Sequence, residues 1–132
     1  MSPLPRRSIL RPMSEPPRYR IRIVFGPEEM IGPGKAELLE RIAATGSIAA
    51  AGREMGMSYK RAWQLVETLN AMFREPLVLR SRGGARGGGA AVTEAGRAVL
   101  AEYRALEAEA ERAGAPHVGR LQALMRDIPE GT

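Results

Sequence analysis

Residues 47–73, SIAAAGREMGMSYKRAWQLVETLNAMF, decide how the rest of this chain is interpreted. Ser47 and Ser58 are each suited to begin a helix, because a serine hydroxyl accepts a hydrogen bond from a free first-turn amide. Gly56 lies between them and favours the left-handed backbone in which many helices end. Met57 is apolar inside this turn and is expected to point into the core. The pattern predicts two short helices joined by a tight turn, which is a helix-turn-helix.

The second of these helices has a buried side and a polar side. Its apolar residues recur at helical spacing and predict one buried stripe, formed by Ala62, Val66, Leu69 and Phe73. The polar residues outside the stripe are Lys60, Arg61, Gln64 and Thr68. Basic and amide side chains near the helix N-terminus are typical of a recognition helix in the major groove of DNA.

Two simpler interpretations of this helix compete with DNA recognition. Lys60 and Arg61 would be the solvated face of an ordinary core helix if no other signal accompanied them. The serine caps, the glycine turn and the small residues before it favour the helix-turn-helix instead. For Trp63, packing beside the core stripe is a more common role than stacking on a base.

The composition narrows the classes of partner and activity. A formal net charge of +5 and an isoelectric point near 10.4 indicate an anionic partner, either nucleic acid or a membrane surface. The absence of cysteine excludes disulfides, thiolate zinc sites and a cysteine nucleophile. His117 has no neighbouring ligand pair, so we expect no enzyme activity, metal or cofactor. The chain has no apolar run that could span a bilayer and no signal-peptide core, so we expect a cytoplasmic protein without membrane contact.

The segments before the helix-turn-helix are predicted to be an arm, a strand and a helix. Residues 1–17 carry five prolines and three arginines and are expected to form a disordered arm. Residues 19–25 alternate apolar and basic side chains, which predicts a half-buried strand that pairs with a wing or joins a dimer contact. Residues 35–45 predict an amphipathic helix with Leu38, Leu39 and Ile42 on its buried face.

The segments after it predict a hairpin wing and a long helix. A strand at residues 77–80, a glycine-rich loop carrying Arg82 and Arg86, and a second strand at 91–92 form the wing. A nucleotide-binding loop is disfavoured because no Gly-Lys-Ser/Thr element follows, although a surface hairpin without contacts remains an alternative. Residues 94–113 predict a long helix that ends at Gly114-Ala115-Pro116, before a short amphipathic tail at 114–132.

The long helix carries an apolar seam formed by Ala95, Val99, Tyr103, Leu106 and Ala110. The seam is long enough to join two copies of the chain, and packing on its own domain is the alternative. The predicted fold is mainly α with a small β component, a winged helix-turn-helix domain at residues 18–93 followed by a dimerisation helix.

This order of elements resembles the DNA-binding domain of the ModE family of molybdate-responsive regulators and, more distantly, the winged helix of LysR-type regulators. The resemblance lies in Thr45-Gly46-Ser47-Ile48, in residues 56–63 (GMSYKRAW), in Leu69-Asn70 and in the glycine-rich wing. It implies that Ser58, Tyr59, Lys60 and Arg61 begin the recognition helix in the major groove. It also implies that Arg82 and Arg86 lie over the backbone or the minor groove.

The chain departs from the family pattern in two places. Members that sense molybdate have a C-terminal oxyanion-binding domain, and this chain ends at Thr132 without room for one. We therefore do not expect this chain to bind molybdate directly. The central basic residue of the wing is also displaced to Arg86, where the family has a lysine slightly earlier.

The resulting hypothesis is a homodimeric transcriptional regulator that binds double-stranded DNA at a two-fold symmetric operator. Lys60 and Arg61 are expected to contact phosphate or guanine, and Gln64 is expected to contact adenine. The other candidate DNA contacts are Ser47, Ser58, Tyr59, Arg80, Arg82 and Arg86. Two alternatives remain, a sequence-neutral nucleoid-type DNA binder and a protein-interaction module that does not bind DNA.

Overall fold

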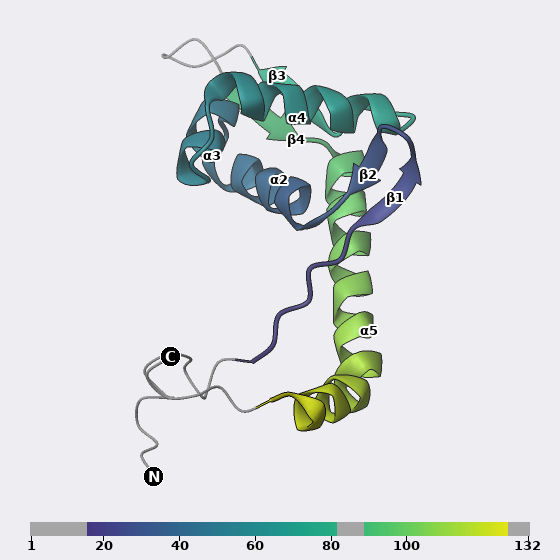
Figure 1. Ribbon diagram of the computed structural model, residues 1–132. Helices are drawn as coiled ribbons and strands as arrows, with labels where there is room; N and C mark the ends of the chain where they lie inside the picture. Colours follow the sequence, from purple (N-terminus) through teal and green to yellow (C-terminus); the bar gives the residue numbers. More distant parts are fainter. Residues whose placement is uncertain (1–15, 82–88, 127–132) are drawn as a thin grey trace. The chain divides into compact units, whose positions relative to one another are not determined.

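The computed structural model describes residues 16–81 and 89–126 of the 132-residue chain. Its elements in chain order are β1 (Ile23–Gly26), β2 (Glu29–Ile31), α2 (Pro33–Thr45), α3 (Ile48–Glu54), α4 (Tyr59–Met72), β3 (Val78–Ser81), β4 (Gly89–Val92) and α5 (Glu94–Leu124) (Figure 1). A helix-turn-helix, a two-stranded wing and a long C-terminal helix are all present, so the predicted fold class is confirmed. Most of the predicted arm and the wing residues Arg82 and Arg86 lie outside the described residues.

The chain divides into two compact units. Residues 20–107 form the larger unit. Of the described residues, 16–19 and 108–126 belong to the smaller unit, so α5 contributes to both. Within the described residues, no helix combines the length and the apolar composition needed to cross a bilayer.

The local signals around the helix-turn-helix are confirmed. Ser47 Oγ accepts a hydrogen bond from Ala50 N at 3.0 Å, and Ser58 Oγ accepts one from Arg61 N at 3.0 Å. Gly56 has a φ of 76°, in the left-handed region that a residue with a β-carbon rarely adopts. These caps set where α3 and α4 begin.

The core of the larger unit lies among α2, α3, α4 and the strands. The predicted stripes of α2 and α4 are buried in it, except that Phe73 at the end of the α4 stripe is only partly buried. Met55, Met57 and Trp63 also pack against the core from partly exposed positions. The fully buried large side chains are Leu38, Leu39, Ile42, Val66, Leu69 and Leu77. This three-helix core holds α4 in place and leaves its opposite side open to solvent.

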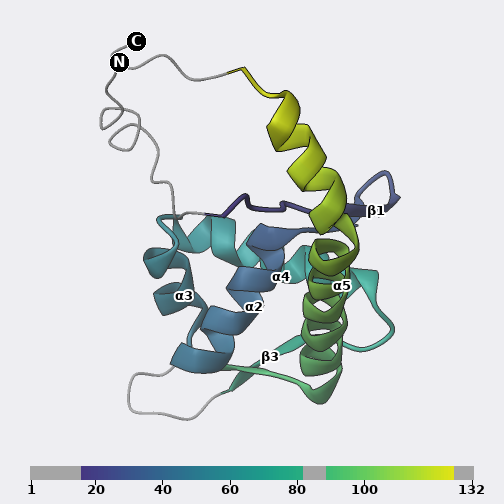
Figure 2. The same ribbon diagram turned by 90° about the horizontal axis from the view of Figure 1, so that it is seen from below.

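The two antiparallel strand pairs form separate sheets. Strand β3 pairs with β4, which gives the predicted wing, and β1 pairs with β2. The prediction that the first strand pairs with the wing is therefore wrong. Its partner is the short segment Glu29–Ile31, which a two-residue turn brings back alongside it. The two hairpins lie apart in both Figure 1 and Figure 2.

The alternation predicted for the first strand also fails at its end. Ile21 and Ile23 are partly buried, but Phe25 is 61% exposed. The register between β1 and β2 shifts between Val24 and Gly26, which is a bulge. Because a bulge interrupts the two-residue period of a strand, Phe25 loses the inward orientation expected from its position.

Helix α5 extends further than the sequence indicated. The prediction that Gly114-Ala115-Pro116 ends the helix is wrong, since α5 continues to Leu124 with Pro116 inside it. Proline removes one hydrogen bond of the helix ladder, and Gly114 and Gly119 near it are weak helix formers, so local propensity does not account for this continuation. Tyr19 also packs tightly against Gly114, where a β-carbon would lie 2.7 Å from the tyrosine hydroxyl.

The first half of the α5 seam packs on its own domain. Tyr103 belongs to the core and donates a hydrogen bond from its hydroxyl to the Ile21 carbonyl at 2.6 Å. Ala95 and Val99 pack against the same core, whereas Leu106 is 40% exposed. The packing alternative is thus correct for the part of the seam up to Tyr103.

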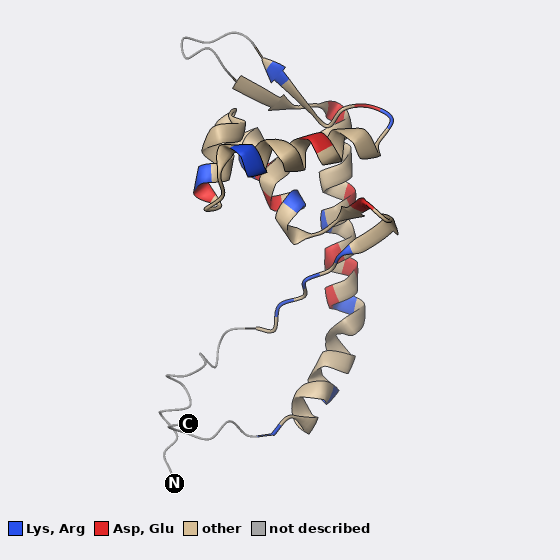
Figure 3. Ribbon diagram, turned by 45° about the horizontal axis from the view of Figure 1, so that its top comes forward, with Lys and Arg blue, Asp and Glu red and all other residues tan. Residues whose placement is uncertain are grey.

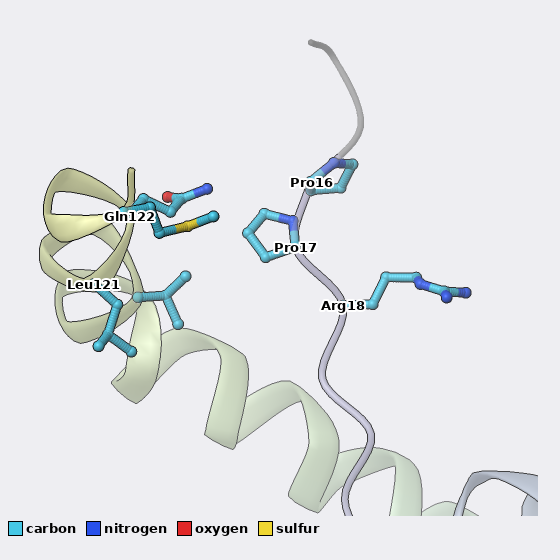
Figure 4. Close-up of a pocket in the computed structure, with 7 residues that line it drawn as sticks. Pro16, Pro17, Arg18, Leu121 and Gln122 are labelled. Carbon is cyan, nitrogen blue, oxygen red and sulfur yellow. The ribbon is translucent and has the colours of Figure 1, made fainter. Parts of the chain in front are cut away.

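The smaller unit has an open apolar pocket. Pro17 of the extended segment faces the last turns of α5 across it, while the side chain of Arg18, which also lines the pocket with Pro16, points away from the helix (Figure 4). The helix contributes Val118, Leu121, Gln122 and Met125.

Candidate nucleic-acid interface

Helix α4 presents a solvent-exposed ridge on the side opposite its buried stripe. Four exposed residues recur along it at i, i+4, i+7 and i+11, namely Lys60, Gln64, Glu67 and Ala71. Lys60 and Gln64 lie in the first two turns, where a recognition helix contacts bases. Glu67 was not among the predicted site residues, although the same helical spacing would have placed it on this ridge.

Tyr59 and Ser58 lie at the start of α4, beside this ridge, and Ser47 lies at the start of α3. Tyr59 is the first residue of α4 and is 49% exposed. Ser58 is exposed, but its hydroxyl is already used to cap α4, as that of Ser47 is used to cap α3. The structure therefore gives both serines a capping role.

One flank of α4 is joined to the wing. Arg80 of β3 lies over the Trp63 ring, with its guanidinium carbon 5.0 Å from the ring centroid. The Asn70 side chain accepts hydrogen bonds from Leu77 N and Val78 N and donates one to Val78 O, at 2.8–3.1 Å. These contacts hold the first wing strand in a defined position beside the recognition helix.

The other flank of α4 faces a cluster of cations that the sequence interpretation missed. Lys35 in the first turn of α2 is only 7% exposed, and its Nζ donates to the Met30 carbonyl at 2.8 Å. Burial lowers the pKa of Lys35, and the charges of Arg61 and Arg22 lower it further. No local pattern predicts this burial, because the hairpin that covers Lys35 was not expected.

The cations of the larger unit separate into paired and unpaired groups. Arg41 is paired with Glu37 and Glu54, and Arg104 is paired with Glu40 and Glu107. Hydrogen bonds to these carboxylates raise the pKa of both arginines. Besides Arg20, Arg53, Arg74 and Arg97, the basic residues of the larger unit that have no carboxylate partner among the described residues are Arg22, Lys35, Lys60, Arg61 and Arg80.

The structure thus brings most of the predicted site residues to one element and its flank. Tyr59, Lys60, Arg61 and Gln64 lie together on the first two turns of α4. Arg80 lies on the adjoining wing strand. Ser47 lies one helix earlier, and the positions of Arg82 and Arg86 are outside the described residues.

Comparison with known proteins agrees with this arrangement. The model of the bacterial regulatory helix-turn-helix proteins of the lysR family matches residues 34–97. Residues 34–97 are thus similar to the lysR-type helix-turn-helix domain. The matched range runs from the start of α2 through α3, α4 and the wing into the first turn of α5.

Three relatives show how far the similarity of this chain to known proteins extends. It is 52% identical over 77 residues to the molybdenum-pterin-binding protein MopA of Rhodobacter capsulatus, covering 58% of this chain and 29% of that protein. It is 40% identical over 97 residues to the molybdenum transport protein ModE of Azotobacter vinelandii, covering 74% of this chain and 34% of that protein. It is 38% identical over 71 residues to the DNA-binding transcriptional dual regulator ModE of Escherichia coli K12, covering 54% of this chain and 27% of that protein.

These matches confirm the resemblance to the DNA-binding domain of the ModE family. The chain spans only about a third of the length of these relatives, as the 29% and 34% coverages show. What the rest of each relative does therefore has no counterpart in the matched residues.

Proposed function

We propose that this chain is a transcriptional regulator that binds double-stranded DNA through α4 and the β3–β4 wing. The observation that carries this function is the exposed ridge of α4 with unpaired cations on it and beside it. A helix about 10–12 Å wide fits the major groove, which is about 12 Å wide. The lysR-type domain and the ModE relatives support the same function.

The proposed contacts follow from where each side chain lies. Lys60 and Gln64 on the exposed ridge are placed to read base edges, with Gln64 suited to adenine. Arg61 lies at the side of the ridge and is better placed for phosphate. The remaining candidate contacts to the DNA backbone are Ser47, Ser58, Tyr59 and Arg80. Arg82 and Arg86, which lie outside the described residues, are proposed from the sequence alone.

We further propose that two copies bind a two-fold symmetric operator. Support comes from the apolar side chains of α5 that the core does not cover, which include Leu106, Leu121 and Leu124. Exposed apolar surface on a long helix favours association with another copy. Two of these relatives carry molybdenum in their names. We propose that molybdate does not bind this chain directly.

The testing experiment is selection of bound fragments from sheared genomic DNA at physiological salt with excess competitor DNA. Enrichment of a symmetric site, unchanged by added molybdate, is the expected result. We expect Lys60→Ala or Gln64→Ala to weaken binding to that site by about 1–3 kcal/mol, because each substitution removes a side chain that reads a base edge. Arg112→Ala, which removes an exposed charge from the smaller unit, is the matched control.

Failure to enrich any site while duplex DNA is still bound would identify a sequence-neutral binder. Absence of duplex binding would leave the protein-interaction module as the better description.

A further inference from the structure

We propose that Arg22 and Lys35, together with Arg61, form a second phosphate-binding surface on the flank of α4 opposite the wing. This inference rests on the proposed DNA binding and adds residues to it from the segment before β1 and from α2. Figure 3 shows blue positions on the extended segment before β1, at the start of α2 and at the start of α4.

The two flanks of α4 follow from the helical repeat. Arg61 and Trp63 are two residues apart, so they point about 200° away from each other around the helix axis. Trp63 faces the wing through Arg80, and Asn70 on the same flank bonds to β3. Arg61 therefore points away from the wing, toward the side where its charge affects Lys35.

Arg22 is held in a defined place although its side chain is exposed. Its Cβ and Cγ pack against Gly32, where a β-carbon would lie 3.7 Å from each of them. The residue before it, Ile21, is fixed by the hydrogen bond from the Tyr103 hydroxyl to its carbonyl. The backbone at Arg22 and the first carbons of its side chain are thus held beside the start of α2.

Of the three residues, Lys35 is the one whose charge is buried, which costs folding free energy. Among the described residues, its ammonium donates a hydrogen bond to a neutral group, the carbonyl of Met30. Burial lowers the pKa of Lys35 most, and repulsion from the charges of Arg61 and Arg22 lowers it further. A phosphate group would relieve this repulsion, whereas the paired arginines Arg41 and Arg104 are already neutralised by glutamates.

The geometry of DNA places a phosphate backbone where this second surface could contact it. The major groove is bordered on each side by a phosphate backbone, and a helix in the groove has one backbone along each flank. Arg80 and the wing are on one flank, and the cluster of Arg22, Lys35 and Arg61 is on the other. Contacts of this kind position the protein without reading sequence.

The test compares the salt dependence of duplex binding for the full chain and its variants, using the selected site and a scrambled duplex. Arg22→Gln and Lys35→Met keep most of the side-chain stem but remove the charge. We expect each to reduce the slope of log affinity against log salt by about 0.9 and to weaken binding about three- to tenfold. The ratio of affinities for the two duplexes should stay unchanged, because phosphate contacts carry no base information.

Three further variants make the result decisive. Arg22→Lys should retain the slope, because an ammonium still binds phosphate. Arg112→Ala should also retain it, which excludes a general effect of net charge. Lys60→Ala should reduce the affinity ratio, since Lys60 lies on the base-reading ridge. A cooperative thermal unfolding transition in each variant shows that it is folded before its DNA binding is compared.

The outcomes separate the two proposals. If the unaltered chain binds duplex DNA and Lys60→Ala weakens it, but Arg22→Gln and Lys35→Met keep both slope and affinity, the second surface is overturned and DNA binding stands. If the unaltered chain does not bind duplex DNA, the proposed function fails and this inference fails with it.

Discussion

Lys35 lies where two physical effects oppose its charge. It is buried in the first turn of α2, and the partial positive charge of a helix N-terminus disfavours a cation there. Its hydrogen bond to the Met30 carbonyl offsets only part of this cost. The residue is thus expected to lower stability while contributing to binding of an anionic partner.

We predict that Lys35→Met raises the free energy of unfolding at pH 7 by roughly 1 kcal/mol. The folded pKa of Lys35 lies below 10.5, so the unfolded state binds more protons between these two pKa values. Stability of the unaltered protein should therefore rise with pH in that alkaline window, and the variant should lack this rise. Urea unfolding across the alkaline range measures both effects. A less stable variant at pH 7 would show that the bond to Met30 outweighs the burial cost.

Gly52 allows α3 and α4 to approach closely. A β-carbon at this position would lie 2.9 Å from the Ala62 Cβ, which is closer than such atoms normally come. We predict that Gly52→Ala lowers the free energy of unfolding by about 1–3 kcal/mol, because the two helices must separate.

Gly34→Ala is the matched control for this substitution. It also lies in a helix but has nothing within 4 Å of the added carbon. Alanine there should stabilise by about 0.5–1 kcal/mol through helix propensity. Chemical denaturation of the two variants compares them directly, and equal effects would contradict the role given to Gly52.

At the scale of elements, hydrogen bonds from side chains and turns join the wing to the helices. Asn70 connects α4 to β3, and Ala90 N of β4 donates to the Gly46 carbonyl between α2 and α3 at 2.9 Å. Thr93 accepts a hydrogen bond from Gly96 N and donates to the Pro76 carbonyl. Both ends of the described wing strands are therefore held by neighbouring helices.

We predict that Asn70→Ala destabilises the protein by about 2–3 kcal/mol, because two amides and one carbonyl lose their partner. Amide hydrogen exchange at Leu77 and Val78 should become faster than elsewhere in the domain. Thr68→Ala is the control, since its hydroxyl bonds only to the Gln64 carbonyl within the same helix. Unchanged exchange at Leu77 in Asn70→Ala would refute this anchoring role.

Over the whole chain, apolar surface on α5 is divided between the core and solvent. Tyr103 is used within its own domain, while Leu106 on the same seam is exposed. The seam therefore has only its later part free for a second copy.

We predict that the unaltered chain sediments as a dimer and that Leu106→Glu shifts it toward the monomer, because a charge replaces apolar contact. The variant should lose more affinity for the symmetric operator than for one half-site. Ala105→Glu adds the same charge beside the seam, and this variant should still sediment with the mass of a dimer. A dimer that persists in Leu106→Glu would move the interface away from this seam.

The elements whose determinants are local were predictable from the sequence. Ser47 and Ser58 cap helices, Gly56 adopts a left-handed backbone, and the stripe of α4 is buried, all as their neighbours in the chain indicated. Each of these features depends on backbone amides or helical spacing within a few residues. The exposed ridge with Lys60 and Gln64 follows from the same spacing.

Features that depend on distant residues were decided only by the tertiary structure. The β1–β2 pairing, the burial of Lys35 and the packing of Tyr103 on the core each need contacts between separate segments. The continuation of α5 through Pro116 likewise accompanies the packing of Tyr19 on Gly114, residues far apart in the chain. Local periodicity determines which face of an element is apolar, but the free energy of burial depends on which other segment covers that face.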